Sequence, residues 1–458
     1  MAHFDVVVIG GGTAGSNAAR TASTAGAQTA LIRNPVLANT CVDVGCMPSK
    51  AVLAAAADGL PLASAVAHGT AVSERLEESL SAALEREDYE IYWGTARFTD
   101  SHTVVVTNHD GEHTLTADRI VIATGATAFV PNIPGLTDLT FPQRLLSDDV
   151  VGIHATLRER PARLLVLGAG PIGLELATFF DRLGSDVLVL ERNPQVLRLM
   201  DPEFGSERQR LADAGYSFRI APAAELVHIG PTETALVATL ERNGTREQTF
   251  VDAILVATGR RPHLTGLNLE AAGLTPDERG RIAHDRETLQ SEEQSHIYLA
   301  GDVTGHHQIL HMGAAMGRTA GANAAHGTPR EWIDFQPLSL AVIFEEFESA
   351  VLGYTEADAL EAGLDVVTAA RDLADVGRGI TDRLPGGHMK LIAERSSGRI
   401  LGAQLLGPHA GEIIQILGPA LYNENTAADL LAMPFWYHPT FGELWHSLAK
   451  DIEAQRST

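Results

Sequence analysis

The only two cysteines of this 458-residue chain lie close together, in the segment TCVDVGCMPSK at residues 40–50. Cys41 and Cys46 are followed by Lys50, one of only three lysines in the sequence. Two interpretations of this spacing are open. Either the cysteines are small buried hydrophobic residues, or they are a pair that opens and closes as a disulfide. In a cytoplasmic protein, nearby cysteines more often indicate redox chemistry or metal binding than a structural disulfide.

Histidines provide two further candidates for chemistry. His438 and Glu443 lie in YHPTFGELW, where the imidazole can carry protons and the carboxylate would fix its tautomer. A lone histidine–glutamate pair, however, is more often a surface contact. A second cluster, in GHHQILHMG, has a spacing at which neutral imidazoles can bind zinc or copper. Its members are His306, His307 and His311.

Two segments repeat a pattern of apolar strand, glycine-rich turn, helix and second strand. They are FDVVVIGGGTAGSNAARTASTAGAQTALI and ARLLVLGAGPIGLELATFFDRLGSDVLVLE. In each, the first glycine permits a tight turn, the second lets the backbone approach a pyrophosphate, and the third lets helix and strand pack closely. Together they predict two dinucleotide-binding sites. Their glycines are Gly10, Gly12 and Gly15 in the first copy and Gly168, Gly170 and Gly173 in the second.

Each copy is followed by an apolar strand that ends in Ala-Thr-Gly, at residues 118–126 and 252–260. Such a strand can close a nucleotide-binding unit and pass under its ligand, although a buried strand with a glycine turn fits each segment alone. The matched placement favours nucleotide contacts from Thr124, Gly125 and Gly259.

The charge of the chain excludes some classes of partner. There are 58 acidic and 34 basic residues, a formal net charge of −24, and such a field repels nucleic acid and anionic membranes. The N-terminal segment lacks the features of a secretory signal. The most apolar segment elsewhere is too short and interrupted to span a bilayer. We therefore expect a cytoplasmic protein that binds neither nucleic acid nor membrane.

In this order, the motifs resemble those of the flavin-dependent pyridine nucleotide–disulfide oxidoreductases, and the dihydrolipoyl dehydrogenases most closely. TCVDVGCMPSK resembles the family's redox-active disulfide motif, and YHPTFGE its C-terminal acid–base motif. AGD at residues 300–302, with Gly301 and Asp302, resembles its flavin-contacting turn. The resemblance covers nearly the whole chain. It implies FAD and NAD as cofactors and a homodimer as the active unit.

The resemblance also implies roles for the thiol pair. Cys41 and Cys46 would form the redox disulfide, with Cys46 facing the flavin and Cys41 the substrate. A thiolate near a helix N-terminus and a cation has a lowered pKa, as a nucleophile requires. Lys50, which alternatively is a solvated helix residue, would lie by the flavin and pair with Glu175.

For the histidines, the same resemblance implies that His438 and Glu443 come from the other subunit and complete the disulfide site. The segment from His306 to His311 resembles a flavin-lining loop, so we expect structural or flavin-facing roles there and no metal site.

The implied fold is α/β, with two Rossmann-like dinucleotide-binding domains, for FAD and NAD, and a C-terminal α+β dimerisation domain. We expect an FAD-binding part with the redox disulfide at residues 1–148 and an NAD-binding domain at 149–275. A central FAD-binding part would follow at 276–334, and the dimerisation domain at 335–458.

Two positions bear on the nucleotides. Where the family places an acidic residue on the adenosine ribose of FAD, this chain has Arg33. An arginine cannot accept hydrogen bonds from ribose hydroxyls, so adenosine recognition must differ, for example through stacking on adenine. At the corresponding position of the second copy, Glu191 can accept a hydrogen bond from a free 2′-hydroxyl and would repel a 2′-phosphate, which favours NAD(H).

Three functional hypotheses follow. The first is an NAD-linked dihydrolipoyl dehydrogenase that acts on a dithiol, for example on a lipoyl-carrying protein. The second is a reductase of another disulfide or oxidant, because the segment after Cys46 is shorter than in typical dihydrolipoyl dehydrogenases. Mercuric reductases and large thioredoxin reductases are excluded at this stage, because they need a second cysteine pair near the C-terminus and this chain has no third cysteine. The third is a flavin-bearing redox sensor.

Overall fold

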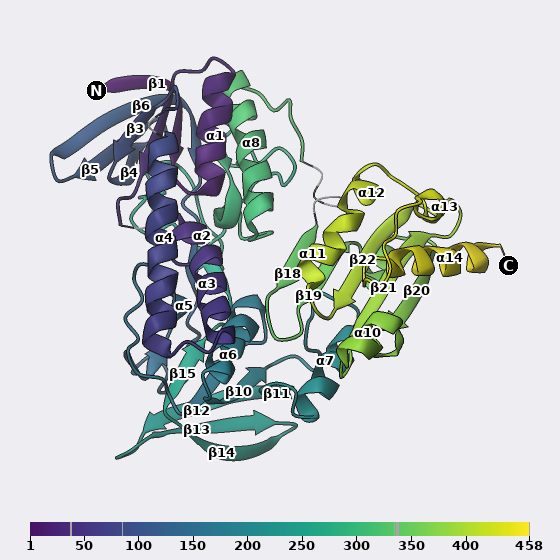
Figure 1. The fold of residues 1–458 in the computed structure, drawn as a ribbon. Coiled ribbons are helices and arrows are strands. Elements are labelled where there is room, and N and C mark those ends of the chain that lie inside the picture. Colours follow the sequence, from purple (N-terminus) through teal and green to yellow (C-terminus); the bar gives the residue numbers. More distant parts are fainter. Residues whose placement is uncertain (37–38, 85, 334, 336–338, 458) are drawn as a thin grey trace.

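The computed structural model describes residues 1–36, 39–84, 86–333, 335 and 339–457. Within these residues, three large sheets organise the chain (Figure 1). One large hydrophobic cluster contains residues of both the second and the third sheet, such as Val166 and Val351. The architecture is mixed α/β with parallel Rossmann-like sheets, as the sequence predicted. No described helix is long and apolar enough to cross a membrane.

The first sheet is built around β1 (Ala2–Ile9), which pairs in parallel with β2 (Thr29–Arg33) and β6 (Gly111–Ile122). The three valines at 6–8 are fully buried, as expected for a parallel strand covered on both faces. The strand order is β3-β2-β1-β6-β5-β4, with β17 (Ile297–Leu299) paired to β6. The other members are β3 (Glu90–Trp93), β4 (Thr95–Asp100) and β5 (Thr103–Asn108).

Helices α1 (Thr13–Thr24) and α8 (Leu310–His326) lie side by side (Figure 1). Glycines permit this approach, because a Cβ on Gly317 would lie 2.2 Å from the carbonyl oxygen of Ala14. Helices α2 (Thr40–Asp43), α3 (Cys46–Ala57) and α4 (Leu62–Leu84) follow β2 and pack against one another (Figure 1). The redox motif therefore lies on two short helical segments that follow β2.

The second sheet is parallel and has the order β11-β10-β9-β15-β8. Its strands are β8 (Arg144–Leu145), β9 (Arg163–Leu167), β10 (Asp186–Glu191), β11 (Arg219–Pro222) and β15 (Ala253–Val256). Its helices are α5 (Ser147–Val150), α6 (Pro171–Arg182) and α7 (Pro202–Asp213). Smaller sheets join β12 (Ala224–Pro231), β13 (Leu236–Arg242) and β14 (Thr245–Val251), and β7 (Ala126–Ala128) with β16 (Arg260–Pro262).

The C-terminal part is an antiparallel sheet of order β18-β19-β22-β21-β20, packed against helices around the fully buried Trp445. Its strands are β18 (Leu340–Ile343), β19 (Ser349–Gly353), β20 (Val366–Asp372), β21 (His388–Glu394) and β22 (Ile400–Leu406). Its helices are α9 (Glu356–Glu361), α10 (Gly377–Asp382), α11 (Ala410–Ile414), α12 (Gly418–Tyr422), α13 (Ala427–Ala432) and α14 (Leu444–Arg456). Short 3-10 turns are η1 (Gly301–Thr304), η2 (Leu373–Asp375) and η3 (Gln415–Leu417).

The domain boundaries remain predictions. Leu136 and Leu139 pack with the core of the second sheet, and Leu267 and Leu274 pack with the core of the first. The first two leucines lie before the expected boundary at 148, and the other two lie before the expected boundary at 275. The expected boundary at 334 falls on a residue outside the described part of the chain.

Candidate active site

The two cysteines lie on consecutive helical segments, Cys41 in α2 and Cys46 at the first position of α3. Gly45 between them allows the tight connection, because a Cβ there would lie 2.6 Å from the carbonyl oxygen of Thr40. Both cysteines are free thiols, and their side chains hydrogen-bond to each other. The disulfide between Cys41 and Cys46 remains a prediction.

The two thiols have opposite acidities. The hydrogen bond from Cys41, assisted by the charge of Lys50, lowers the pKa of Cys46 to about 7, against the effect of burial. The same hydrogen bond and burial raise the pKa of Cys41. Cys46 is therefore the thiol that ionises near neutral pH, and Cys41 is the one that retains its proton.

Lys50 forms the ion pair predicted for it. Its Nζ lies 2.8 Å and 3.0 Å from the two carboxylate oxygens of Glu175 in α6. The pair joins the helix that carries Cys46 to the helix that begins at the second glycine motif. Lys50 is thus not a freely solvated helix residue.

His438 and Glu443 are in direct contact, as their spacing suggested. The ring Nδ1 lies 2.9 Å from Oε1 of Glu443, just ahead of α14. An ionised carboxylate only accepts hydrogen bonds, so Nδ1 carries the hydrogen and Nε2 is the basic nitrogen. The side chain of His438 is 76% exposed, so it can meet a group from outside its own chain.

Within one chain this pair is far from the thiols. His438 and Glu443 lie between α13 and α14, across the molecule from α2 and α3 (Figure 1). The structure does not bring the predicted acid–base pair to the thiols of the same chain.

The first glycine turn has the shape that a dinucleotide needs. Gly10 has φ +112°, and a Cβ on Gly15 would lie 1.7 Å from the carbonyl oxygen of Gly10. Gly12 precedes α1 and provides no side-chain cap, so the first N–H groups of the helix stay available to phosphates. The turn thus fits the pyrophosphate of FAD.

The other predicted flavin contacts surround this turn. The backbone of Thr124 lies beside Gly10, and the buried Oγ1 of Thr124 has no hydrogen-bond partner in the described part of the chain. Gly125 follows it. Gly301 and Asp302 begin η1 after β17, and burial raises the pKa of Asp302.

Arg33 does not face an open ligand site. Its side chain is fully buried, ion-paired with Glu77 of α4 and 5.3 Å from the ring centre of Trp93. A Cβ on Gly11 would lie 2.6 Å from Cγ of Arg33, so the arginine crosses the glycine turn. The guanidinium stacks on a protein ring, which corrects the expectation that it is available to adenine.

The second glycine turn repeats this geometry. Gly168 has φ +102°, and a Cβ on Gly173 would lie 2.0 Å from the carbonyl oxygen of Gly168. A Cβ on Gly170 would meet no described atom within 4 Å, so the space beside it is free for a ligand. Glu191 ends β10 and accepts a hydrogen bond of 3.1 Å from the N–H of Ala169 within the turn. Gly259 follows β15, with φ +117°.

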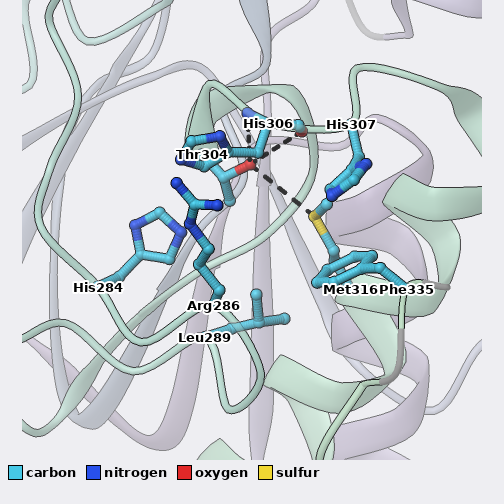
Figure 2. Close-up of a pocket in the computed structure, with 8 residues that line it drawn as sticks. All are labelled: His284, Arg286, Leu289, Thr304, His306, His307, Met316 and Phe335. Atoms are coloured by element: carbon cyan, nitrogen blue, oxygen red, sulfur yellow. Dashed lines mark hydrogen bonds between the residues drawn. The ribbon is translucent and has the colours of Figure 1, made fainter. Parts of the chain in front are cut away.

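Two of the three clustered histidines line a small cavity, and the expectation that no metal binds there stays a prediction. His306 and His307 line a cavity of about 10 Å³ beside Thr304 and Met316 (Figure 2), which is room for no more than one water molecule. Burial lowers the pKa of His306 to about 4. His311 belongs to α8.

Among the described residues, the acids close enough to share a metal ion are Asp201, Glu203 and Glu356. The ammonium of Lys390 lies 2.5–2.9 Å from all three carboxylates. The cluster is therefore an ion-pair network, and it joins the start of α7 to the C-terminal sheet.

Comparisons with known proteins agree with this geometry. Residues 4–326 match the model of the pyridine nucleotide-disulphide oxidoreductases, and residues 339–449 match the dimerisation domain of the same family. The chain belongs to the pyridine nucleotide-disulphide oxidoreductases. Members of this family are FAD-containing, NAD(P)-dependent enzymes, and the residues around both glycine turns fit these cofactors.

The individual relatives of this chain are named for different activities. A mercuric reductase from Shigella flexneri is 33% identical, over 94% of this chain and 78% of the relative. A dihydrolipoyl dehydrogenase from Bacillus subtilis (strain 168) is 31% identical, over 96% of this chain and 94% of the relative. The HOCl-induced flavoprotein disulfide reductase RclA from Escherichia coli, solved as a Cu(II) complex, superposes with a TM-score of 0.85 at 27% identity, over 98% of this chain and 99% of that one.

Sequence reasoning missed two residues at these sites. Glu77 pairs with Arg33 from a helix beyond the redox motif. Phe344, the residue after β18, touches both Lys50 and Glu175. No local motif marks either residue. The only available signal was for Glu77, because the charge of Arg33 needs an acidic partner if it is buried.

Proposed function

We propose that this disulfide oxidoreductase moves electrons between a dithiol substrate and NAD(H), and that dihydrolipoyl groups are its substrate class. The observation that carries the proposal is the unequal thiol pair beside Lys50. A disulfide exchange proceeds fastest when the sulfur that leaves has the lower pKa. Cys46 has this property and Cys41 does not.

The chain's own residues would act in order. His438 of one subunit takes the proton of a substrate thiol at Nε2, and Glu443 stabilises the charged ring. The substrate thiolate attacks Sγ of Cys41, the Cys41–Cys46 bond breaks, and Cys46 leaves as a thiolate held by Lys50. The second substrate thiol then displaces Cys41, which releases the substrate as a disulfide and leaves both cysteines reduced.

FAD, when bound, supplies the two-electron transfer from the reduced cysteines to NAD⁺. The net reaction converts dithiol and NAD⁺ into disulfide, NADH and H⁺. Gly10, Gly12 and Gly15 would hold the FAD pyrophosphate, while Gly168, Gly170 and Gly173 would hold that of NAD.

The test is turnover of dihydrolipoamide with NAD⁺ by wild-type and His438→Ala protein. Because a positioned base contributes about 10²–10⁴ in rate, the variant should lose activity by that factor. Flavin content and bleaching of the flavin by NADH should be unchanged. Wild-type protein that is yellow and reducible by NADH but inactive with dihydrolipoamide would reject the substrate class.

A second candidate is reduction of another oxidant by NADH. The similarity to mercuric reductases and to RclA favours it. The chain has no cysteine besides Cys41 and Cys46, so no second cysteine pair relays electrons to such a substrate. NADH oxidation with lipoamide, Hg(II) and Cu(II) salts in parallel distinguishes the candidates.

A further inference from the structure

Phe344 contacts both members of the ion pair beside the thiols. Its backbone N–H donates a hydrogen bond of 3.2 Å to Oε1 of Glu175. The centre of its ring lies 4.7 Å from Nζ of Lys50, within the range of a cation–π contact. One residue of the C-terminal part therefore meets the carboxylate with its backbone and the ammonium with its ring.

The residues after Phe344 fix its position. Glu345 is buried and accepts a hydrogen bond of 2.8 Å from the equally buried Arg208 of α7. Glu346 lies 2.8 Å from Arg182 of α6. The same arginine donates to the carbonyl oxygen of Leu53 in α3, at 3.1 Å. The turn formed by residues 344–346 is thus anchored to α3 and α6, the two helices that carry the ion pair. The ring therefore has little freedom to move away from Lys50.

We propose that Phe344 is a positioning residue that holds the Lys50 ammonium where it stabilises the Cys46 thiolate. Glu175 alone draws the ammonium toward α6, and the aromatic face provides a second attractive surface on another side. Without the ring, the four-carbon chain of Lys50 gains freedom and water can reach the ammonium, so its charge would act less on Cys46. The inference rests on the proposed function only for the importance of that thiolate.

Several charged or titratable groups surround these atoms. Cys41, Lys50 and Glu175 act on Cys46 directly. Arg208, Glu345, Arg182 and Glu346 surround the turn in the two salt bridges described above. The variants that test the proposal must therefore change the ring of Phe344 and leave these charged residues in place.

The test is the pH dependence of the long-wavelength charge-transfer band between the Cys46 thiolate and the flavin, in the thiol-reduced, FAD-loaded protein. For wild-type protein the band should appear as Cys46 loses its proton, with a midpoint near pH 7. Phe344→Leu should raise this midpoint, by less than Lys50→Gln does, because the ring acts on Cys46 only through the position of the Lys50 ammonium. Phe344→Tyr, which keeps the aromatic face, should restore the wild-type midpoint.

Two controls separate this role from a general loss of packing. Phe347→Leu changes a buried phenylalanine of the same turn and should leave the midpoint unchanged. In a Lys50→Gln background, Phe344→Leu should add no further shift. An unshifted midpoint in Phe344→Leu, an equal shift in Phe347→Leu, or an undiminished shift without Lys50 would each overturn the proposal. None of these measurements uses NAD or a dithiol substrate, so they stand apart from the test of turnover.

Discussion

At the scale of single residues, Arg33 places a positive charge where the family has an acidic residue. The family's acid at the end of the second strand is absent, and the arginine in its place is fully buried. A buried guanidinium needs a counter-charge, which Glu77 provides. Nε and Nη1 of Arg33 have no hydrogen-bond partner within the described residues, so the pair depends strongly on this single contact.

Glu77→Gln should therefore lower the free energy of unfolding by about 3 kcal/mol, because it leaves a buried, uncompensated charge. Urea unfolding followed by tryptophan fluorescence measures the effect, since Trp93 lies beside Arg33. The adjacent, exposed Glu78 supplies the control, and Glu78→Gln should change the stability by no more than about 0.5 kcal/mol. Equal stability of the two variants would show that the ion pair contributes nothing.

At the scale of elements, the end of β10 and the turn before α6 act together. The carboxylate of Glu191 accepts hydrogen bonds from the backbone N–H groups of Ala169 and Asn193. These contacts hold the carboxylate beside the glycine turn, where we expect the ribose of the nucleotide to bind. The neighbouring Arg192 is exposed and makes no comparable contact with the turn.

We predict that Glu191 makes NADH preferred over NADPH by at least about tenfold, because a hydrogen bond to a charged group is worth roughly 1.5–3 kcal/mol. The measurement is the ratio of kcat/KM for the two nucleotides. Glu191→Gln, which keeps the size of the side chain and removes its charge, should reduce the preference. Arg192→Ala should retain or increase it. Equal use of NADPH by the wild-type protein would contradict the assignment.

At the scale of the whole molecule, the C-terminal part serves two redox sites under our proposals. Phe344 reaches Lys50 and Glu175 of its own chain. The exposed His438, by contrast, lies away from the thiols of that chain (Figure 1). The match of residues 339–449 to a dimerisation domain supports a homodimer in which His438 completes the site of the partner subunit.

Mixed dimers test this arrangement. In a hybrid of Cys41→Ser and His438→Ala subunits, one site carries both defects and the other carries neither. Each hybrid should therefore regain about half of the wild-type activity, although both parent dimers are inactive. Differently tagged subunits allow the hybrids to be isolated and their composition confirmed. Inactive hybrids would place the whole site within one chain.

Much of this molecule follows from local sequence. The two nucleotide sites were predicted from short local motifs. These are the two glycine turns and the strands that end near Thr124 and Gly259, and the thiol motif is equally local. The contact between His438 and Glu443 also follows from short spacing. The Lys50–Glu175 pair spans 125 residues, and it was predicted only because a resemblance supplied the partner.

By itself, the sequence predicted the class of chemistry and the cofactors, and it marked the two thiols, His438 and Glu443 as the candidate reacting groups. Only the tertiary structure showed that Arg33 is buried and paired with Glu77, and that Phe344 lies against Lys50. The physical reason is that these contacts join segments 44 and about 300 residues apart, and no local period encodes such pairing. Burial of charge and the packing of separate domains select these contacts, and both depend on the whole folded chain.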